Sequence, residues 1–415
     1  MQKVFDFIQR QRAKKELRKA FSAAGLYIVY QSGDKDIKIF PKIHSVKIDE
    51  DRIGYVFTLI NGMDPKEVTK KEFVFHQFFG QHVEIKGDYK RFVLNIYKRV
   101  HNQAYGFNYS ELEPLMLPFR LPIIAGKDKL GKIHVYDMVK NPHLLIAGET
   151  GGGKSSILRV ILTSLIMFRQ HIKNGLEMYL VDFKRSEFHL FRYIEGVYVI
   201  NKVQDLVKCL KNYLLKELTE RGDLLDAYEL THIDDYNKLP KIQKKPYIIL
   251  CIDEVHDLEG EEKIFRDLHK ISAMGRALGI FLIMATQRPD KDVIEGKTKS
   301  NLTVRYAFAH ADKINSDITL GRGTKADASK ITEEGQFIYR NKGTLNNLAI
   351  LKAPYLPADD EEKFKGAKKL LEPFRIPVEK RVKKYNDGDV IDVEATEGQS
   401  EEIILGVLDD ATYQT

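Results

Sequence analysis

The hydrophobic positions of this 415-residue chain follow two different patterns. Residues 22–112 contain short runs separated by turn signals such as Ser-Gly-Asp and Lys-Gly-Asp, a pattern typical of antiparallel strands. From about residue 121 to residue 355, apolar runs alternate with longer stretches of helical periodicity. Because such apolar runs are typical of strands buried on both faces, this part is predicted to be an α/β domain with a mainly parallel sheet.

The expected elements can be given by residue range. In the first part we expect a helix at 65–80 and strands at 26–30, 37–43, 45–48, 52–59, 82–86 and 91–97. In the second part we expect strands at 144–147, 177–182, 247–252, 281–285, 304–309, 335–339 and 348–351. Its predicted helices cover 154–170, 203–228, 259–277 and 359–372.

These patterns divide the chain into four parts. A basic amphipathic helix is expected over residues 1–20 and a small α+β domain over 21–115. The α/β domain follows over 116–375, and residues 376–415 read as an acidic, weakly ordered tail. The proline-rich stretch 113–122 is a plausible boundary. Two interpretations of the first helix stay open, namely contact with DNA or anionic lipid, and packing on the neighbouring domain.

Charge is unevenly distributed along the chain. The net charge is +7, yet no Lys or Arg follows Lys384, whereas nine acidic residues do. Residues 1–385 therefore carry +16. A basic body with an acidic tail favours a polyanionic partner, and charge that merely keeps the protein soluble is the alternative.

Two cysteines, Cys209 and Cys251, fall in predicted buried elements and far apart in the sequence. They indicate neither a disulfide framework nor a metal site, which fits a reducing compartment. No uninterrupted apolar run reaches the ~20 residues that span a bilayer, and no signal peptide is evident. We expect a cytoplasmic protein that partners are able to recruit to a membrane.

One stretch carries a specific chemical signal. Residues 144–147 are apolar and lead into Gly-Glu-Thr-Gly-Gly-Gly-Lys-Ser, the phosphate-binding P-loop pattern, with an apolar helix after it. Lys154 is expected to reach the β- and γ-phosphates of ATP, and the Ser155 hydroxyl to bind Mg²⁺. The residues predicted to bind the nucleotide are Gly148, Glu149, Thr150, Gly151, Gly152, Gly153, Lys154, Ser155 and Ser156.

Polar residues close two further predicted strands. Asp253 and Glu254 end the apolar run 247–252, where ligands gather in open α/β sheets. Asp253 is expected to bind Mg²⁺ together with Ser155, and Glu254 to act as general base on the attacking water. Thr286 and Gln287 end the next strand, and Gln287 is the better candidate to sense the γ-phosphate or orient the water.

Taken in order, the motifs resemble the motor domain of the FtsK/SpoIIIE DNA translocases, in the HerA–FtsK branch of P-loop ATPases. The resemblance covers about residues 121–355. It rests on Gly126-Lys127-Asp128, Asn141-Pro142-His143 with the P-loop, Val181-Asp182-Phe183-Lys184, Glu220-Arg221, Asp235-Tyr236-Asn237, Ile252-Asp253-Glu254, Gly275-Arg276-Ala277-Leu278-Gly279-Ile280 and Ala285-Thr286-Gln287-Arg288-Pro289. It implies a RecA-like ATPase core.

The resemblance also implies an assembly and further residues. Family members form ring hexamers with ATP between subunits and DNA in the central pore. Arg276 matches the arginine inserted in trans into the neighbour's site, and Lys313 matches a second basic residue offered in trans. Arg288 matches a pore-side DNA contact. The chain departs from the family at Asn315-Ser316-Asp317, where Asp-Ser-Arg is usual, so it lacks the basic residue expected there to contact DNA.

These features predict an ATP-dependent DNA translocase. The absence of membrane spans and of a winged-helix module in this sequence favours a role on a mobile element, in conjugative transfer or maintenance, with a membrane channel or a relaxase as partner. A P-loop ATPase that drives protein secretion and a helper motor in DNA replication or segregation are the alternatives. Single-stranded and double-stranded DNA are not distinguished.

Overall fold

The chain forms two compact units. The structure is a computed structural model. One unit comprises Met1–Asn102 with Lys129–Gly131, and the other comprises Gln103–Asp128 with Lys132–Thr415. Residues described within them are 2–32, 35–50, 52–80, 82–87, 89–97, 104–129, 131–287, 296–324, 326–343, 348–377, 393–395 and 403–405.

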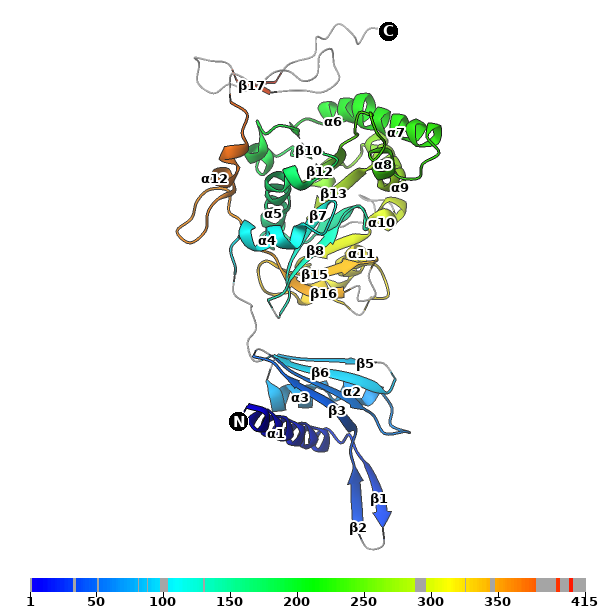
Figure 1. The fold of residues 1–415 in the computed structure, drawn as a ribbon, viewed down its shortest axis with the longest axis vertical. Helices are drawn as coiled ribbons and strands as arrows, with labels where there is room; N and C mark the ends of the chain where they lie inside the picture. Colours follow the sequence, from blue (N-terminus) through cyan, green and yellow to red (C-terminus); the bar gives the residue numbers. More distant parts are fainter. Residues whose placement is uncertain are drawn as a thin grey trace. The chain divides into compact units, whose positions relative to one another are not determined.

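The first unit is an antiparallel sheet with helices packed on it (Figure 1). The sheet has the order β3 (Lys42–Ile48), β4 (Arg52–Thr58), β6 (Arg91–Tyr97), β5 (Val83–Gly87). Its helices are α1 (Gln2–Ala23), α2 (Lys66–Lys70) and α3 (Glu72–Phe79). Phe21 of α1 packs edge-on against Phe57, with ring centroids 4.9 Å apart, which anchors the basic helix to the sheet.

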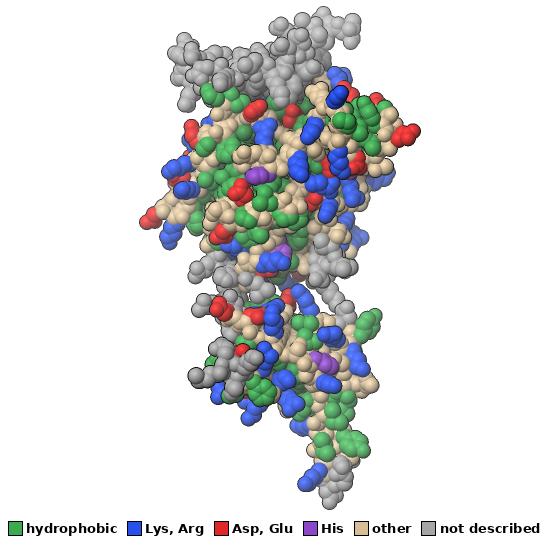
Figure 2. All heavy atoms as spheres, viewed as in Figure 1, with side chains coloured by type: hydrophobic (Ala, Val, Ile, Leu, Met, Phe, Trp, Pro, Cys, Tyr) green, Lys and Arg blue, Asp and Glu red, His purple; other side chains and the backbone are tan. Residues whose placement is uncertain are grey.

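A separate hairpin, β1 (Ile28–Ser32) and β2 (Lys35–Ile39), extends the first unit. The predicted single strand at 37–43 is wrong. β2 ends before Pro41 and β3 begins after it, because the proline nitrogen has no hydrogen to donate to a strand pair. All residues of β2 are exposed. Figure 2 shows hydrophobic side chains gathered on this hairpin.

The second unit is built on a ten-stranded sheet of order β11-β10-β12-β13-β9-β14-β15-β16-β7-β8. Neighbouring strands in the part of the sheet formed by β11, β10, β12, β13, β9 and β14 are parallel. The remaining pairs are antiparallel. This confirms the predicted α/β class with a mainly parallel sheet. The bounds are β7 (Pro122–Lys127), β8 (Ile133–Asp137), β9 (Leu144–Ala147), β10 (Leu176–Val181), β11 (Val197–Ile200), β12 (Tyr247–Ile252), β13 (Ile280–Thr286), β14 (Val304–Ala307), β15 (Gln336–Asn341) and β16 (Leu348–Lys352).

Helices cover both faces of this sheet. In Figure 1, α4, α5 and α12 lie on one side and α9, α10 and α11 on the other. The bounds are α4 (Tyr109–Met116), α5 (Lys154–Met167), α6 (Val203–Cys209), α7 (Leu215–Ala227), α8 (Ile233–Tyr236), α9 (Glu262–Leu278), α10 (Gly296–Asn301), α11 (Lys313–Leu320) and α12 (Ala367–Leu371). A π-helical turn, Leu210–Leu214, joins α6 to α7, so the predicted helix 203–228 is continuous with one local irregularity.

The predicted helix 359–372 is mostly wrong. Only α12 and a following 3₁₀ turn, Glu372–Phe374, are helical there. The carboxylate of Asp360 accepts the backbone N–H of Gly366 at 2.7 Å, which closes residues 360–366 into a loop. An added Cβ at Gly366 would lie 2.2 Å from the backbone of Asp359, so the loop is also tightly packed.

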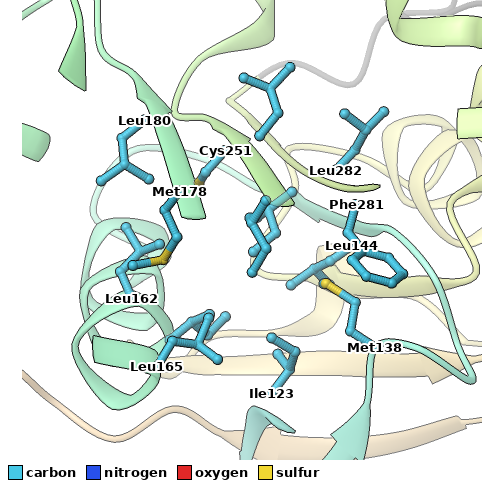
Figure 3. Packing of buried hydrophobic residues seen from close by; sticks show 14 of the residues in the cluster. Ile123, Met138, Leu144, Leu162, Leu165, Met178, Leu180, Cys251, Phe281 and Leu282 are labelled. Atoms are coloured by element: carbon cyan, nitrogen blue, oxygen red, sulfur yellow. The ribbon is translucent and has the colours of Figure 1, made fainter. Parts of the chain in front are cut away.

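The core of the second unit lies between the parallel strands and α5 (Figure 3). Met178, Cys251 and Leu282 come from neighbouring strands, and Leu162 and Leu165 come from α5. Every residue of β12 and β13 is buried, as expected for strands covered on both faces. Burying one such side chain contributes roughly 1.5–3 kcal/mol, so the apolar runs fix the strand positions.

The two cysteines are both buried and free, and burial raises the pKa of the Cys209 thiol. Among the described residues, no helix is long and apolar enough to cross a membrane. Of the predicted acidic tail, the structure describes residues 376–377 and the antiparallel pair β17 (Val393–Ala395) and β18 (Ile403–Leu405).

Candidate ATPase site

The P-loop forms the turn between β9 and α5. Gly148, Gly151 and Gly153 all have positive φ, at 149°, 81° and 108°. Space also requires glycine, because an added Cβ at Gly148 would lie 2.6 Å from Cβ of Phe308 and 3.0 Å from the carbonyl oxygen of Ala309. The sequence pattern therefore has a direct steric cause, since β14 continues into a segment that packs against the loop.

Backbone hydrogen bonds hold the loop from both sides. The N–H of Glu149 donates to the carbonyl oxygen of Ala309 at 2.9 Å, and that of Gly335 donates to Gly152 at 3.0 Å. Within the loop, the N–H of Gly152 donates to Glu149 at 3.3 Å. The segments before α11 and before β15 thus shape the nucleotide loop, although they lie about 160 and 180 residues further along the chain.

The side chain of Lys154 folds over the loop. Its Nζ donates to the carbonyl oxygens of Gly148 at 2.5 Å and Glu149 at 2.8 Å. Burial lowers the pKa of this lysine, and the carboxylates of Glu254, Asp253 and Glu149 oppose that shift. The lysine therefore lies where the loop is expected to hold the β- and γ-phosphates, close to the acid pair.

The two serines of the motif have different environments. Ser155 lies in the first turn of α5, beside Lys154. Ser156 is buried, its Oγ accepts the backbone N–H of Leu356 at 3.0 Å and donates to the carbonyl oxygen of Pro354 at 3.3 Å. Ser156 is also predicted to bind nucleotide, and in the structure its side-chain contacts tie α5 to the segment after β16.

The acid pair follows β12, as predicted. The N–H of Asp253 donates to the carbonyl oxygen of Val181 at 3.1 Å, so the acid leaves the sheet next to the end of β10. Burial, together with the nearby carboxylates of Glu187, Asp182 and Glu254, raises the pKa of Asp253 to about 7. A cation at this position would offset that crowding of negative charge.

The donor set fits Mg²⁺. The ion prefers oxygen ligands and is usually held by one or two protein groups together with the substrate phosphates. Across the described part of the chain, no group of three or more His, Cys, Asp or Glu side chains could hold a metal by itself. Ser155 and Asp253 would therefore hold Mg²⁺ jointly with bound ATP.

The backbone N–H of Gln287 holds Glu254 in place, a contact that the sequence did not predict. Its carboxylate is buried and accepts the N–H of Gln287 at 3.1 and 3.2 Å, and the N–H of His256 at 3.4 Å. The Gln287 side chain in turn accepts the hydroxyl of Thr150 at 2.9 Å. A path of hydrogen bonds thus joins the P-loop, the end of β13 and the proposed general base.

The order of strands explains this path. β13 lies between β9 and β12, so the residue that closes β13 is placed between the P-loop and the acids. Thr286 is fully buried, pairs with Ala147 across the ladder, and accepts the N–H of Gly148 at 3.3 Å through its carbonyl oxygen. The structure therefore brings Lys154 and Gln287 together at one edge of the sheet.

A further loop borders the site. Residues 182–188, after β10, are organised by Asp182, whose carboxylate accepts the N–H groups of Ser186, Glu187 and Phe188 at 3.3, 2.9 and 2.8 Å. Glu187 also forms an ion pair with Arg159 of α5 at 2.5 Å. Asp182 is part of a motif recognised in the sequence. The sequence did not predict the pair between Glu187 and Arg159, because these residues are 28 positions apart and spacing alone does not pair them.

Arg276 does not lie at this edge. It is exposed in the last turn of α9, just before β13 begins. β13 has seven residues and runs parallel to β9, so its two ends are roughly 20 Å apart and Arg276 is at the end away from the P-loop. The side chain therefore cannot reach the nucleotide loop of its own chain.

Lys313 begins α11 and is satisfied within its own chain. Its Nζ lies 2.5 Å from a carboxylate oxygen of Asp317 and donates to the carbonyl oxygen of Ala326 at 2.9 Å. Asp317 stands where the family usually has arginine, so the departure in sequence supplies the partner of Lys313. Arg288, the predicted DNA contact, lies outside the described residues.

Comparison with known proteins matches this site to one family. Residues 117–291 match the FtsK/SpoIIIE family. They form an FtsK/SpoIIIE-family domain. This confirms the predicted resemblance.

The curated relatives of this FtsK/SpoIIIE-family domain are much longer proteins. DNA translocase FtsK of Helicobacter pylori strain J99 is 33% identical over 291 residues, which are 66% of this chain and 33% of that protein. DNA translocase FtsK of Treponema pallidum strain Nichols is 36% identical over 233 residues, which are 53% of this chain and 28% of that protein. The chain thus spans about a third of their length.

A solved structure resembles more of the chain. The pCW3 conjugation coupling protein TcpA, in a monomer form with ATPγS, is 26% identical with a TM-score of 0.56, and the match covers 86% of this chain and 98% of TcpA. The cytoplasmic domain of the Thermomonospora curvata type VII secretion ATPase EccC has a TM-score of 0.54 at 24% identity, covering 62% of this chain and 31% of EccC. At that identity EccC supports the fold alone.

Proposed function

We propose that the protein is an ATPase that uses hydrolysis to move DNA. The observation that carries the proposal is the meeting of Lys154, Asp253, Glu254 and Gln287 at one edge of the parallel sheet, in the order and spacing of an FtsK/SpoIIIE domain. Relatives named DNA translocases support DNA as the polymer.

Each residue has a role that its surroundings support. Lys154 and the loop N–H groups bind the phosphates of ATP. Mg²⁺, held by Ser155 and Asp253, would neutralise charge on the β- and γ-phosphates. Glu254 accepts a proton from the attacking water, because its carboxylate is already oriented by the N–H of Gln287. Gln287 orients the same water or senses the terminal phosphate.

We further propose that the working site is shared between subunits of a ring, a hexamer in this family. Arg276 is exposed and lies near the start of β13, a strand about 20 Å long whose other end meets the P-loop, so any contact with ATP would be made in a neighbour. A trans arginine stabilises charge in the transition state of phosphoryl transfer. Lys313 would act in trans only after its ammonium group leaves Asp317.

The charge of the chain supports DNA rather than a peptide as the polymer. Residues 1–102 carry a net charge of +8, and residues 1–385 carry +16. Figure 2 shows Lys and Arg side chains over the visible faces of both units. Binding through phosphates predicts strong salt dependence and little sequence preference. The likeness to a secretion ATPase supports the fold alone, so secretion stays the alternative.

The proposed process is the transfer or maintenance of a mobile element. The match to the TcpA coupling protein over nearly its whole length supports this. In that setting the protein would be cytoplasmic and would meet a relaxase or a membrane channel.

The test is ATP hydrolysis by the full chain with and without DNA, at several salt concentrations. We expect single- or double-stranded DNA to stimulate turnover, and the stimulation to fall steeply with added salt. Equal turnover with and without DNA at every salt concentration would contradict the proposal. Competing single- and double-stranded DNA would then identify the preferred track.

A mixing experiment tests the shared site. Lys154→Ala removes the P-loop lysine but keeps Arg276, whereas Arg276→Ala keeps the P-loop and removes the arginine. In an equimolar mixture, about a quarter of the interfaces in a random ring pair an intact P-loop with an intact arginine. Recovery of turnover in the mixture, above either variant alone, is expected. A mixture no more active than its components would refute the trans role of Arg276.

A further inference from the structure

Lys184 leaves the sheet at the same edge as the acid pair. β10 and β12 are neighbouring parallel strands in which Val181 lies opposite Ile252, and the N–H of Asp253 donates to Val181 at 3.1 Å. Lys184 is three residues beyond Val181, in the loop that borders the proposed ATPase site. The strand register alone therefore places a second lysine beside the metal and nucleotide residues.

The base of this loop is rigid. Asp182 accepts three backbone N–H groups of residues 186–188, and Glu187 is paired with Arg159 of the P-loop helix α5 at 2.5 Å. Arg185 has a φ of 55°, the left-handed conformation of a tight turn. The loop is thus attached to α5, and the backbone position of Lys184 relative to the P-loop is set by these contacts.

The Lys184 side chain is less constrained than its backbone. It is 50% exposed, and its Nζ is 3.4 Å from a carboxylate oxygen of Asp257. Strong charge-assisted hydrogen bonds are shorter, at about 2.7–2.9 Å, so this ion pair is a loose one.

We propose that Lys184 is a second phosphate-binding lysine, which exchanges Asp257 for the γ-phosphate of ATP. The inference rests on the proposed ATPase function. A lysine carries a compact charge on a flexible four-carbon stem, so it exchanges partners without movement of the backbone. The γ-phosphate brings more negative charge than one carboxylate, and it is the group that distinguishes ATP from ADP.

This assignment predicts opposite effects from the two members of the ion pair. Lys184→Ala removes the ligand of the γ-phosphate, whereas Asp257→Asn removes its competitor. If the pair were only structural, both variants would weaken the same contact and change nucleotide binding in the same direction. The sign of the Asp257→Asn effect therefore separates the two roles.

The experiment measures the affinity of the full chain for ATPγS and for ADP with Mg²⁺, by calorimetry, together with the melting temperature. Lys184→Ala is expected to lower the affinity for ATPγS by about tenfold and to leave the affinity for ADP unchanged, since only ATPγS has the third phosphate. Asp257→Asn is expected to leave the affinity for ADP unchanged and to raise the affinity for ATPγS. Lys238→Ala breaks a similar exposed pair, with Asp235 at 2.7 Å, and serves as matched control.

Three outcomes overturn the proposal, and they are distinguishable. Wild-type chain that binds neither nucleotide refutes the ATPase function and this inference with it. If the wild-type chain binds both nucleotides, the ATPase function stands. The role of Lys184 is then refuted if Lys184→Ala lowers the affinities for ATPγS and ADP equally, or lowers neither. A loss of ATPγS affinity in Asp257→Asn also refutes it, because the pair would then support the site as a structural contact.

Discussion

Glu254→Gln is the change that tests the site most directly. The glutamine has nearly the same shape, but it cannot accept a proton from water. General-base catalysis contributes roughly 10²- to 10⁴-fold to a rate, so we expect the DNA-stimulated turnover number to fall by about that factor. Nucleotide binding should be unchanged, because the P-loop does not depend on this proton transfer.

The structure also sets the expected change in stability. Glu254 is 7% exposed and accepts backbone N–H groups of Gln287 and His256. Glutamine keeps one carbonyl oxygen for the N–H of Gln287, so the free energy of unfolding should change by less than about 1 kcal/mol. Glu254→Ala leaves that buried N–H without an acceptor and should cost about 1–3 kcal/mol.

The assay is steady-state ATP hydrolysis with DNA, alongside thermal unfolding of each variant. Glu259→Gln is a matched control, since Glu259 follows the same 3₁₀ turn and its side chain is 66% exposed. We expect the control to keep wild-type turnover. Turnover of Glu254→Gln within a few-fold of wild type, at unchanged stability, would show that another group takes the proton and would refute the assignment.

Three further outcomes are expected. Lys154→Ala should abolish turnover without unfolding the chain, as measured by hydrolysis and circular dichroism. Ser156→Ala should lower stability by about 1–3 kcal/mol, because the N–H of Leu356 loses its acceptor, while ATPγS affinity stays the same. His143 is buried and burial lowers its pKa to about 4 from 6.5, so its contribution to stability is present above pH 6.5 and lost as the pH falls toward 4. His143→Asn, which suits the φ of 61°, should flatten that pH dependence in thermal unfolding.

The P-loop and the buried strands could be predicted from the sequence because local steric and burial requirements determine their residues. The P-loop was recognisable because its glycines occur at a fixed spacing, at positions where a side chain would not fit. At Gly148, for example, an added Cβ would clash with Cβ of Phe308. The buried strands β12 and β13 were recognisable because burial on both faces requires continuous apolar residues. Asp253 and Gln287 then followed as the residues that close those strands.

What the sequence did not reveal depends on contacts between distant residues. The contacts of Ser156 with Pro354 and Leu356 could not be predicted, because these partners are about two hundred residues away. The strand at 37–43 failed because one proline interrupts an otherwise suitable pattern. The pairing of Glu254 with the N–H of Gln287 could not be predicted, because a backbone donor has no signature in side-chain types.

The connection between α9 and β13 gives the shared-site proposal a physical basis. An added Cβ at Gly275 would lie 2.1 Å from the carbonyl oxygen of Ile280, so the end of α9 is packed tightly onto the start of β13. The N–H of Leu282 in β13 also donates to His143 at 3.0 Å, which fixes the strand to the start of β9. Gln287, at the far end of β13, contacts the P-loop of its own chain, while Arg276 at the near end faces outward. If Arg276 acts in a neighbouring site as proposed above, a shift of Gln287 on loss of the γ-phosphate would be carried along β13 to that arginine and would couple one site to the next.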